Sequence, residues 1–403
     1  MARCAELAMC TEEAGRITRP YGTPSLIAAR ELIAAWMRQA GLDVRTDAIG
    51  NIRGRYAGSR TDAPALLLGS HFDSVRDAGK YDGPLGILIA IAAIERLAER
   101  GERRPFPIEI VAFPDEEGLR FQTTYLGSTA LAGTFNLALL DRPDQEGIIL
   151  REAIAAFSGD PDDLPSATLQ PDEAFAYVEV HIEQGPFLES VAAPLGIVTA
   201  ISGQTRLLAT FNGEAGHAGT VAMHLRRDPL PAAAELALAV ESLARATPRL
   251  LSTVGAIQAV PGVSNVIPSS VRLSLDVRHP EDAQREHAVR HLEQHACSIA
   301  ATRDLGLDWE LVRDHPAVEC DPALVAGLSQ AVVDSGLPLH LLPSGAGHDA
   351  VMIASRLPIG MLFVRCEGGI SHNPAESVTT EDVAAATAVI DRFVDDLARD
   401  ERR

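Results

Sequence analysis

The stretch "LLLGSHFDSVRDAGKYDGPLG", from Leu66 to Gly86, places a histidine and acidic residues directly after an apolar run. The run predicts a buried strand that ends at His71 and Asp73, and "PLGILIAIAAIERLAERG" (84–101) predicts a helix. Asp82 lies in the glycine-flanked loop between them. A His-x-Asp pair alone is most often a surface hydrogen bond or a cap, so the rest of the chain decides whether these residues are functional.

The flanking segments extend this strand and helix into an α/β fold. The next apolar run, "PIEIVAFPDEEG" (107–118), completes a β-α-β unit, and two later runs have the same character, "FAYVEVHIEQGP" (175–186) and "IGMLFVRCEGGISHNP" (359–374). Strands that are apolar almost throughout are typical of a parallel sheet covered by helices on both faces. Helix-period segments at 25–41 and 379–400 supply part of that cover. We therefore expect an α/β domain with a mostly parallel sheet.

The middle of the chain predicts a second domain of another kind. Between residues 205 and 313 the pattern runs strand, helix, strand, strand, helix, strand. This β-α-β-β-α-β order is that of a small ferredoxin-like domain with an antiparallel sheet. We expect an α+β insert at residues 205–318, between two parts of the α/β domain at 1–204 and 319–403.

Composition excludes several classes of protein. The chain has 403 residues, of which 46% are hydrophobic, enough for two or three domains. Its net charge of −20 repels polyanions, so we expect no nucleic-acid partner. The longest uncharged apolar run, Gly86–Ile94, is far shorter than the ~20 residues that span a bilayer. The start, "MARCAELAMCTEEAGR", lacks the plan of a secretory signal, so we expect a cytoplasmic protein with no membrane partner.

Polar residues follow each of the predicted parallel strands. Ligands of an open parallel sheet bind beyond the carboxyl ends of its strands, so these residues are expected to converge. They are His71 and Asp73 after the first strand, Asp115, Glu116 and Glu117 after the second, and His181 and His372 at the ends of the later two. Three histidines and several carboxylates suffice for two divalent metal ions, each with a position left open for water.

The acidic residues of this group are suited to different roles. Asp82, held in a loop, can donate one oxygen to each of two ions about 3.5–4 Å apart, a spacing typical of hydrolases that activate a water between two Lewis acids. Asp73 follows His71 by two residues and is better placed to accept its imidazole N–H. Glu116 and Glu117 are adjacent, so their side chains diverge, and one can bind metal while the other transfers protons.

Eight motifs follow one another along the whole chain. They are "GSHFDSVRDAGKYDGPLG" (69–86), "DEEGLRF" (115–121), "HIEQGP" (181–186), "GEAGHAGT" (213–220), "SNVIPSS" (264–270), "LDVRH" (275–279), "SGAGHDA" (344–350) and "GGISHNP" (368–374). In this order they resemble the allantoate amidohydrolase and N-carbamoyl-L-amino-acid hydrolase group of the dinuclear metallopeptidase clan, which includes aminoacylases. The resemblance implies two bound divalent ions, Zn2+ or Mn2+, with Co2+ or Ni2+ as alternatives.

The resemblance also implies which residues hold these ions. His71, Asp82 and His181 would hold one ion. Asp82 would bridge to the second, which Glu117 and His372 would also hold. The remaining glutamate, Glu116, would be the general base that takes a proton from the attacking water and passes it to the departing nitrogen.

In relatives of this group the insert is a lid and dimerisation domain, which implies a homodimer. His217, Asn265 and Arg278 resemble residues that reach an active site, commonly that of the neighbouring subunit. His217 can stabilise an oxyanion, and Arg278 can bind a substrate carboxylate through two N–H groups, although without the resemblance Arg278 is more typical of a surface charge. Four further residues are expected on the substrate side, Gln184, Ser344, Gly345 and His348. The glycines of "SGAG" are equally compatible with a tight turn.

The reaction implied by the resemblance is hydrolysis of a ureido group, R–NH–CO–NH2, in a small anionic substrate. "TEEAGRITRPYGTPS" (11–25) and "VRCEGGISHNPAES" (364–377) resemble allantoate-degrading relatives more closely, so we expect allantoate, which yields ureidoglycine, ammonia and carbon dioxide. N-carbamoyl-L-amino acids or ureidopropionate come second. A dipeptidase or aminoacylase, and a metal-dependent binding protein without catalysis, are further alternatives; the intact Glu116 argues against the last.

Overall fold

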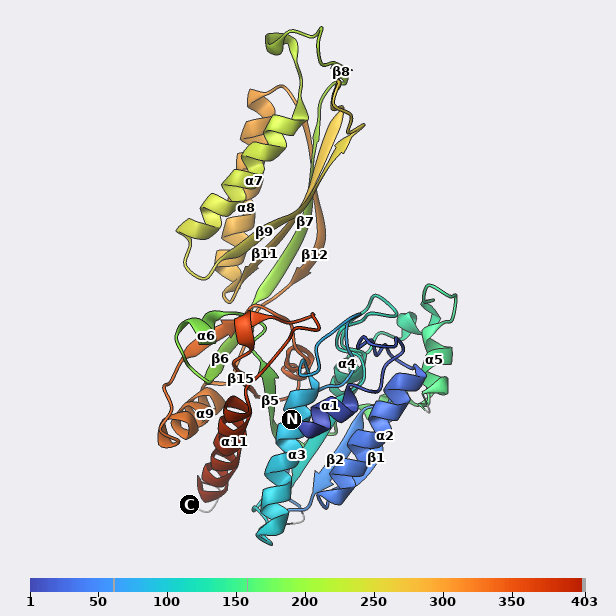
Figure 1. Ribbon diagram of the computed structural model, residues 1–403, viewed down its shortest axis with the longest axis vertical. Helices are drawn as coiled ribbons and strands as arrows, with labels where there is room; N and C mark the ends of the chain where they lie inside the picture. The colour runs from blue at the N-terminus through green and yellow to red at the C-terminus, as the bar shows by residue number, and fades with distance from the viewer. Residues whose placement is uncertain (61, 158, 401–403) are drawn as a thin grey trace. The chain divides into compact units, whose positions relative to one another are not determined.

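The computed structural model describes residues 1–60, 62–157 and 159–400 (Figure 1). The chain forms two compact units. Unit 1 comprises residues 1–199, 320–342 and 347–403, and unit 2 comprises residues 200–319 and 343–346.

A mixed sheet with helices packed against it forms the centre of unit 1. Its strand order is β1-β2-β4-β3-β5-β15-β6-β13, and β14 pairs with β6; β13 and the last two residues each of β6 and β14 belong to unit 2. The central strands β4, β3, β5 and β15 run parallel, whereas β1, β2, β6 and β13 pair antiparallel with their neighbours. The strands are β1 (Asp43–Thr46), β2 (Ile52–Tyr56), β3 (Ala65–His71), β4 (Ile108–Phe113), β5 (Ala174–Ile182), β6 (Leu195–Ile201), β13 (Val318–Glu319), β14 (Leu341–Ser344) and β15 (Ile359–Val364).

Helices connect and cover these strands. They are α1 (Ala2–Leu7), α2 (Pro24–Gln39), α3 (Pro84–Glu99), α4 (Leu126–Ala132), α5 (Leu150–Ala156), α6 (Phe187–Ser190), α9 (Pro322–Asp334), α10 (Ala350–Ile353) and α11 (Thr380–Asp400). Short 3-10 turns are η1 (Leu137–Asp141), η2 (Leu164–Ala167) and η4 (Glu367–Gly369). The parallel strands with their helices confirm the predicted α/β fold class.

The central strands are apolar almost throughout because both of their faces are covered. On β5, alternate residues from Ala176 to Ile182 join the main core with residues of α2, α3, α9 and α11. The intervening residues, from Tyr177 to His181, occupy the other face. There the buried Glu179 carboxylate accepts a hydrogen bond from the main-chain N–H of Ala350, at the start of α10 (3.1 Å). The sheet therefore has no solvated face at its centre, and polar side chains gather at the strand ends.

Unit 2 has the predicted β-α-β-β-α-β order. Its main elements are β7 (Gly203–Asn212), α7 (Pro229–Ala246), β9 (Leu251–Val260), β11 (Ser270–His279), α8 (Asp282–Thr302) and β12 (Gly306–His315). The strands form an antiparallel sheet in the order β12-β7-β11-β9, with α7 and α8 on one face (Figure 1). Shorter elements are β8 (Gly216–His217), η3 (Met223–Leu225) and β10 (Val266–Ile267). This arrangement confirms the ferredoxin-like insert.

The core of unit 2 lies between this sheet and its two helices. Alternate residues of β7, Leu207, Ala209 and Phe211, are buried against α7 and α8. The residues between them lie on the opposite face and are partly exposed, so the strand shows the alternation typical of a sheet with one solvated face.

None of the described helices is both long enough and apolar enough to cross a lipid bilayer.

Candidate metal centre

The candidate ligands lie at the carboxyl ends of four neighbouring strands of unit 1. His71 is the last residue of β3, and His181 is the penultimate residue of β5. Glu117 follows β4, and His372 follows β15. Because β4, β3, β5 and β15 are consecutive in the sheet and parallel, their carboxyl ends meet at one edge.

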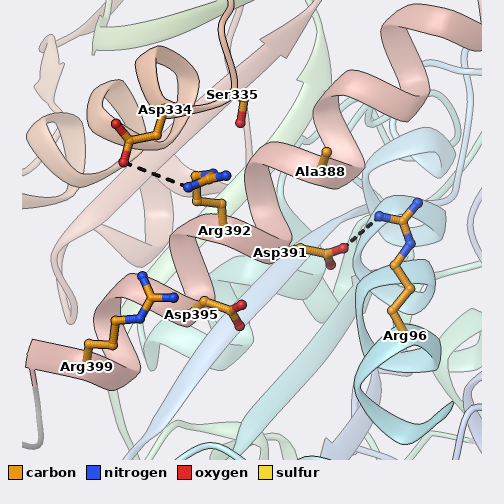
Figure 2. Close-up of a pocket in the computed structure, with 8 residues that line it drawn as sticks. All are labelled: Arg96, Asp334, Ser335, Ala388, Asp391, Arg392, Asp395 and Arg399. Carbon is orange, nitrogen blue, oxygen red and sulfur yellow. Dashed lines mark hydrogen bonds and ion pairs between the residues drawn. The ribbon is translucent and has the colours of Figure 1, made fainter. Parts of the chain in front are cut away.

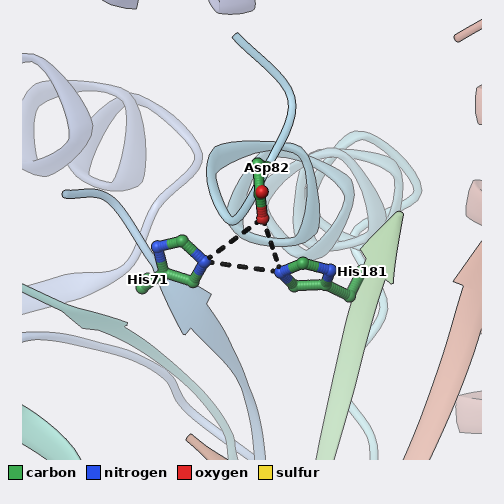
Figure 3. A group of neighbouring side chains, drawn as sticks. All are labelled: His71, Asp82 and His181. Carbon is green, nitrogen blue, oxygen red and sulfur yellow. Dashed lines mark hydrogen bonds and ion pairs between the residues drawn. The ribbon is translucent and has the colours of Figure 1, made fainter. Parts of the chain in front are cut away.

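One oxygen of Asp82 faces two of these histidines. Asp82 Oδ1 lies 3.1 Å from His181 Nε2 and 3.6 Å from His71 Nε2, and the two ring nitrogens are 3.4 Å apart. Figure 3 shows the carboxylate directed between the two imidazole rings. Two ligands of one tetrahedral ion, each bound at 2.0–2.1 Å, lie about 3.4 Å apart. The three atoms therefore have the spacing of ligands that share a cation.

The other oxygen of Asp82 faces a second set of donors. Asp82 Oδ2 lies 3.3 Å from His372 Nε2, which also lies 3.3 Å from Glu117 Oε1. These two sets are among the acidic and histidine groupings whose ligand atoms all lie within 4.8 Å of one another. Asp82 is common to both sets and offers a different oxygen to each.

A glycine allows Asp82 to approach His71 this closely. Gly83 has a φ of +81°, a conformation that favours glycine, and it precedes Pro84, the first residue of α3. A Cβ atom at Gly83 would lie 2.5 Å from the imidazole ring of His71. Any other residue at this position would displace the ring from Asp82.

Asp73 connects His71 to the turn that carries the two glutamates. Its Oδ1 atom lies 3.3 Å from His71 Nδ1 and accepts a hydrogen bond from the main-chain N–H of Glu116 (3.0 Å). Its Oδ2 atom accepts one from the main-chain N–H of Glu117 (3.1 Å). Asp73 thus contacts the far side of the His71 ring, where it can hold the N–H of the Nδ1 tautomer and leave Nε2 for metal.

Glu116 has a different environment from Glu117. Burial raises the pKa of the Glu116 carboxyl well above its usual range, and the nearby Glu117 carboxylate raises it further. Glu117 instead faces His372. A buried carboxyl with a raised pKa, next to a group of candidate ligands, is a stronger base than an ordinary carboxylate and is suited to proton transfer.

The donor atoms fit a cation better than they fit one another. His181 Nδ1 lies 2.9 Å from the carbonyl of Ile182, which can only accept, so Nδ1 carries a proton and Nε2 is the nitrogen that faces Asp82. Asp82 Oδ1 is buried and has no hydrogen-bond partner among the described residues. Burial lowers the pKa of His181, but the Asp82 carboxylate more than offsets this and leaves it raised. The site therefore attracts positive charge, and its imidazole and carboxylate donors suit Zn2+, Mn2+, Co2+ or Ni2+.

Two residues predicted on the substrate side of unit 1 contact the candidate ligands themselves. The Gln184 amide donates a hydrogen bond to Asp82 Oδ2 (2.9 Å), and its own oxygen is buried without a partner among the described residues. His348 is 1% exposed and packs its ring edge-on against His181 and against Phe363. The structure thus places His348 against His181.

Five predicted residues belong to unit 2, where they form two separate groups. His217, in β8, pairs with Val266 of β10, next to Asn265, whose carbonyl accepts a hydrogen bond from the Ala218 N–H (3.0 Å). His217 is exposed, and its Nδ1 accepts a hydrogen bond from the Gly219 N–H, which leaves Nε2 as the N–H of the neutral ring. This tautomer can donate to an oxyanion.

The second group of unit 2 is centred on Arg278. Its guanidinium donates to both oxygens of Asp276 (2.7 and 3.1 Å) and to the carbonyl of Gly345 (2.7 Å). The Ser344 hydroxyl is buried in the adjoining turn, where it bonds the main chain of Ala346. β10 precedes the start of β11, which begins at Ser270, whereas Arg278 is the last residue but one of β11. At about 3.4 Å per residue, Arg278 therefore lies roughly 27 Å from the start of the strand. One copy of unit 2 therefore does not bring His217 and Arg278 together.

Sequence reasoning missed two partners of these residues. Asp276, which holds Arg278, stands inside the motif "LDVRH", and Ser371, which donates a hydrogen bond to Asp82, stands inside "GGISHNP". Their place in the motifs was the available signal. Their hydrogen-bond partners depend on side-chain orientation, which a linear pattern does not contain.

A surface hollow elsewhere in unit 1 is not lined by the candidate metal ligands. It has a volume of about 470 Å3. Figure 2 shows that it is lined mainly by arginine and aspartate side chains from α3, α9 and α11, with ion pairs between Arg96 and Asp391 (2.7 Å) and between Arg392 and Asp334 (3.9 Å). Its lining includes no candidate metal ligand, and its charges largely neutralise one another.

Comparison with known proteins identifies the family of this chain. A family model described as peptidase family M20/M25/M40 matches residues 67–396. The chain belongs to this family. An N-carbamoyl-L-amino acid amidohydrolase of Geobacillus stearothermophilus is 42% identical over 97% of this chain and 95% of its own length. An allantoate deiminase of Arabidopsis thaliana is 41% identical over 98% of this chain and 81% of its own length.

A solved structure of the same kind has the same fold. An amidase of the hydantoinase/carbamoylase family from Burkholderia multivorans superposes with a TM-score of 0.92 at 35% identity, over 98% of this chain and 95% of its own. The resemblance found in the motifs is confirmed by these relatives. The protein is a hydrolase that acts on amide C–N bonds, in a metal-dependent family, and it carries groups of residues that can bind metal.

Proposed function

We propose that this protein is an allantoate amidohydrolase that uses two divalent cations to cleave a ureido group. The observation that carries the proposal is Asp82, whose two oxygens face two different donor sets beside an additional carboxyl, Glu116. When bound, two divalent cations would supply the Lewis acidity that polarises the ureido carbonyl and stabilises the developing negative charge. His71, His181 and Asp82 would hold one, and Asp82, Glu117 and His372 the other.

Glu116 supplies proton transfer. Its carboxylate takes a proton from the attacking water as the oxygen adds to the ureido carbon. It then gives that proton to the departing nitrogen as the C–N bond breaks. The products are the amine R–NH2 and carbamate, which decomposes to ammonia and carbon dioxide. The raised pKa of Glu116 suits this exchange, because it makes the carboxylate a stronger base.

Arg278 binds the carboxylate of the substrate. Three of its five N–H groups are engaged by Asp276 and Gly345, which leaves one N–H on each terminal nitrogen. Two such donors match the two oxygens of a carboxylate. Allantoate carries a carboxylate on the carbon that bears its ureido groups, so a fixed guanidinium would select it over neutral ureas.

The protein acts as a homodimer, in which each subunit completes the site of the other. In one chain His217 and Asn265 lie at the opposite end of β11 from Arg278, so these residues cannot meet the same substrate unless a second subunit supplies one group. The edge strand β9 supports this proposal, because Leu251, Ile257 and Val260 on it are each about half exposed. An apolar edge strand is a ready surface for pairing with another chain.

Comparing substrates on the metal-reconstituted protein tests the assigned activity. Ammonia release is measured with Mn2+ or Zn2+ present, for allantoate, N-carbamoyl-L-amino acids, ureidopropionate, ureidoglycolate and a dipeptide. We expect the highest kcat/KM for allantoate. A higher value for an N-carbamoyl-L-amino acid would favour the second candidate, which the relative from Geobacillus stearothermophilus supports equally. Turnover of the dipeptide alone would make the protein a dipeptidase. Bound cations with no turnover would indicate a binding protein.

A further inference from the structure

Asp82 is held by contacts beyond its two sets of candidate ligands. Its Oδ2 atom accepts hydrogen bonds from the Ser371 hydroxyl (2.6 Å) and from the Gln184 amide (2.9 Å). Its Oδ1 atom has no hydrogen-bond donor in the described part of the chain and faces His71 and His181. The two donors therefore fix the rotation of the carboxylate, so that Oδ1 stays turned toward one ligand set.

The main chain of Asp82 is fixed by Glu376. Oε1 of Glu376 accepts hydrogen bonds from the N–H groups of Tyr81 (2.8 Å) and Asp82 (3.1 Å). Oε2 of Glu376 lies 3.4 Å from the hydroxyl of Ser371. Glu376 is 3% exposed. One buried carboxylate thus contacts both the backbone of Asp82 and the hydroxyl that orients its side chain.

The loop that carries Asp82 leaves room for this carboxylate. A Cβ atom at Gly79 would lie 2.2 Å from the Glu376 carboxyl carbon, so a larger residue there would push Glu376 away. A buried carboxylate is costly unless it is hydrogen-bonded. Glu376 offsets that cost with bonds to the Asp82 loop, 294 residues away along the chain.

The order of the strands explains how such distant residues meet. Asp82 follows β3, Gln184 follows β5, and Ser371 and Glu376 follow β15. These three strands are consecutive in the sheet and parallel. Their following loops therefore lie beside one another at the edge where the candidate ligands converge.

We propose that Glu376 is a positioning residue, which acts with Ser371 to hold Asp82 in the orientation that shares its two oxygens between two cations. This inference rests on the proposed function, because it concerns the same site, but it makes a statement about cation binding that needs no substrate. Residues that orient metal ligands from outside typically change metal affinity or activity by about 10–100-fold.

Calorimetric titration of the metal-free protein with Mn2+ tests the proposal. We expect Glu376→Ala to weaken Mn2+ binding by about 10–100-fold and, on the loaded enzyme, to lower kcat with little change in KM. Glu376→Gln keeps an acceptor oxygen for both N–H groups, so we expect it to recover most of the affinity. Ser371→Ala leaves the backbone contacts in place and is expected to weaken binding by about tenfold.

Asp321→Ala is the matched control. Asp321 Oδ1 also accepts two main-chain N–H groups, those of Ala323 (2.9 Å) and Leu324 (3.0 Å), at the start of α9. Its own N–H donates to the carbonyl of Ile359, at the opposite end of β15 from His372. This variant loses the same kind of contact, so we expect a lower Tm with unchanged Mn2+ affinity.

Several outcomes would overturn the proposal. Wild-type Mn2+ affinity in Glu376→Ala would do so, as would failure of Glu376→Gln to recover affinity. A loss of affinity that tracks Tm equally in Glu376→Ala and Asp321→Ala would indicate a structural role only. If Glu376→Ala does not fold, Ser371→Ala and Glu376→Gln decide the matter. If the wild type binds Mn2+ but releases no ammonia from ureido compounds, the proposed function fails while the titration still tests Glu376.

Discussion

Replacing Glu116 with glutamine separates proton transfer from metal binding and from folding. Glu116 is 9% exposed, and its main-chain N–H is fixed by Asp73. Glutamine has nearly the same shape but cannot take a proton from water. Because Glu116 also groups with His71 and Glu117, the substitution further tests whether Glu116 is a metal ligand.

The expected loss of kcat in Glu116→Gln is large because the adjacent carboxyl cannot take over proton transfer. A positioned general base contributes about 10²–10⁴-fold to a rate, or about 2.7–5.4 kcal/mol. The adjacent carboxyl, Asp115, has both oxygens buried, so it cannot reach a water in place of Glu116. We therefore expect kcat to fall by about 10³–10⁴-fold, in the upper half of that range, with little change in KM.

The same substitution should not destabilise the protein. Burial, and then the Glu117 carboxylate, raise the pKa of Glu116, which means that its charged form is unfavourable in the folded state. When an acid has a higher pKa in the folded state than in the unfolded state, the protein loses stability as the pH rises above the unfolded-state pKa. Measured without metal at pH 7, Glu116→Gln should therefore have a Tm equal to or above that of the wild type. The difference should vanish below about pH 4, where the unfolded glutamate is protonated as well.

Three measurements check this prediction together. They are ammonia release at saturating Mn2+, bound metal per chain, and Tm. The matched variant Glu117→Gln should lose cation affinity, because its carboxylate faces His372. Near-wild-type turnover in Glu116→Gln would refute the assignment of the general base. Loss of bound metal in Glu116→Gln, with metal retained in Glu117→Gln, would show that the two roles are reversed.

Three further predictions concern substrate, protons and subunits. Asp276→Asn removes a carboxylate that holds the guanidinium of Arg278. In steady-state kinetics, KM for carboxylate substrates should therefore rise about tenfold with kcat little changed. An unchanged KM would refute this prediction. The Asp82 and Glu117 carboxylates raise the pKa of His372 to about 10, so cation binding at this set must displace a proton. The apparent affinity for the cation should therefore rise about tenfold per pH unit between pH 7 and 9. A calorimetric affinity that stays constant over this pH range would contradict the prediction. Mixing the His217→Ala and His372→Ala proteins, so that their subunits exchange, should restore about a quarter of wild-type activity. Half of the dimers would then contain one subunit of each variant, and each such dimer would have one intact site. No recovery of activity would place both residues in one subunit's site.

The parallel centre of unit 1 could be predicted from sequence because its strands are continuously apolar. β2 could not, because it carries Arg53, which is 2% exposed and pairs with the buried Glu109 of β4 at 2.5 Å. A charged residue in a short segment normally indicates a surface. Here the neighbouring strand supplies the opposite charge, and that pairing is visible only in the folded sheet.

The candidate ligands could be placed together from sequence for a related reason. Each follows a predicted parallel strand, and parallel strands end at the same edge. The partners of these residues could not be predicted in the same way. The Gln184 amide bonds Asp82, and the Arg278 guanidinium is shared between Asp276 and Gly345, because loops and side chains meet in ways that strand order alone does not specify.

The carboxyl groups around the site fall into two kinds, and this division determines where negative charge gathers in the site. Burial raises the pKa of Asp115, Asp349 and Glu179, which disfavours negative charge on these carboxyls. Burial acts on Asp82 in the same direction, but the surrounding imidazoles outweigh it and hold its pKa well below the usual range. Negative charge is therefore concentrated at the ligand atoms, where two divalent cations would more than neutralise it. The net charge of −20 thus does not set the local field, which two bound divalent cations would make positive at the ligand atoms.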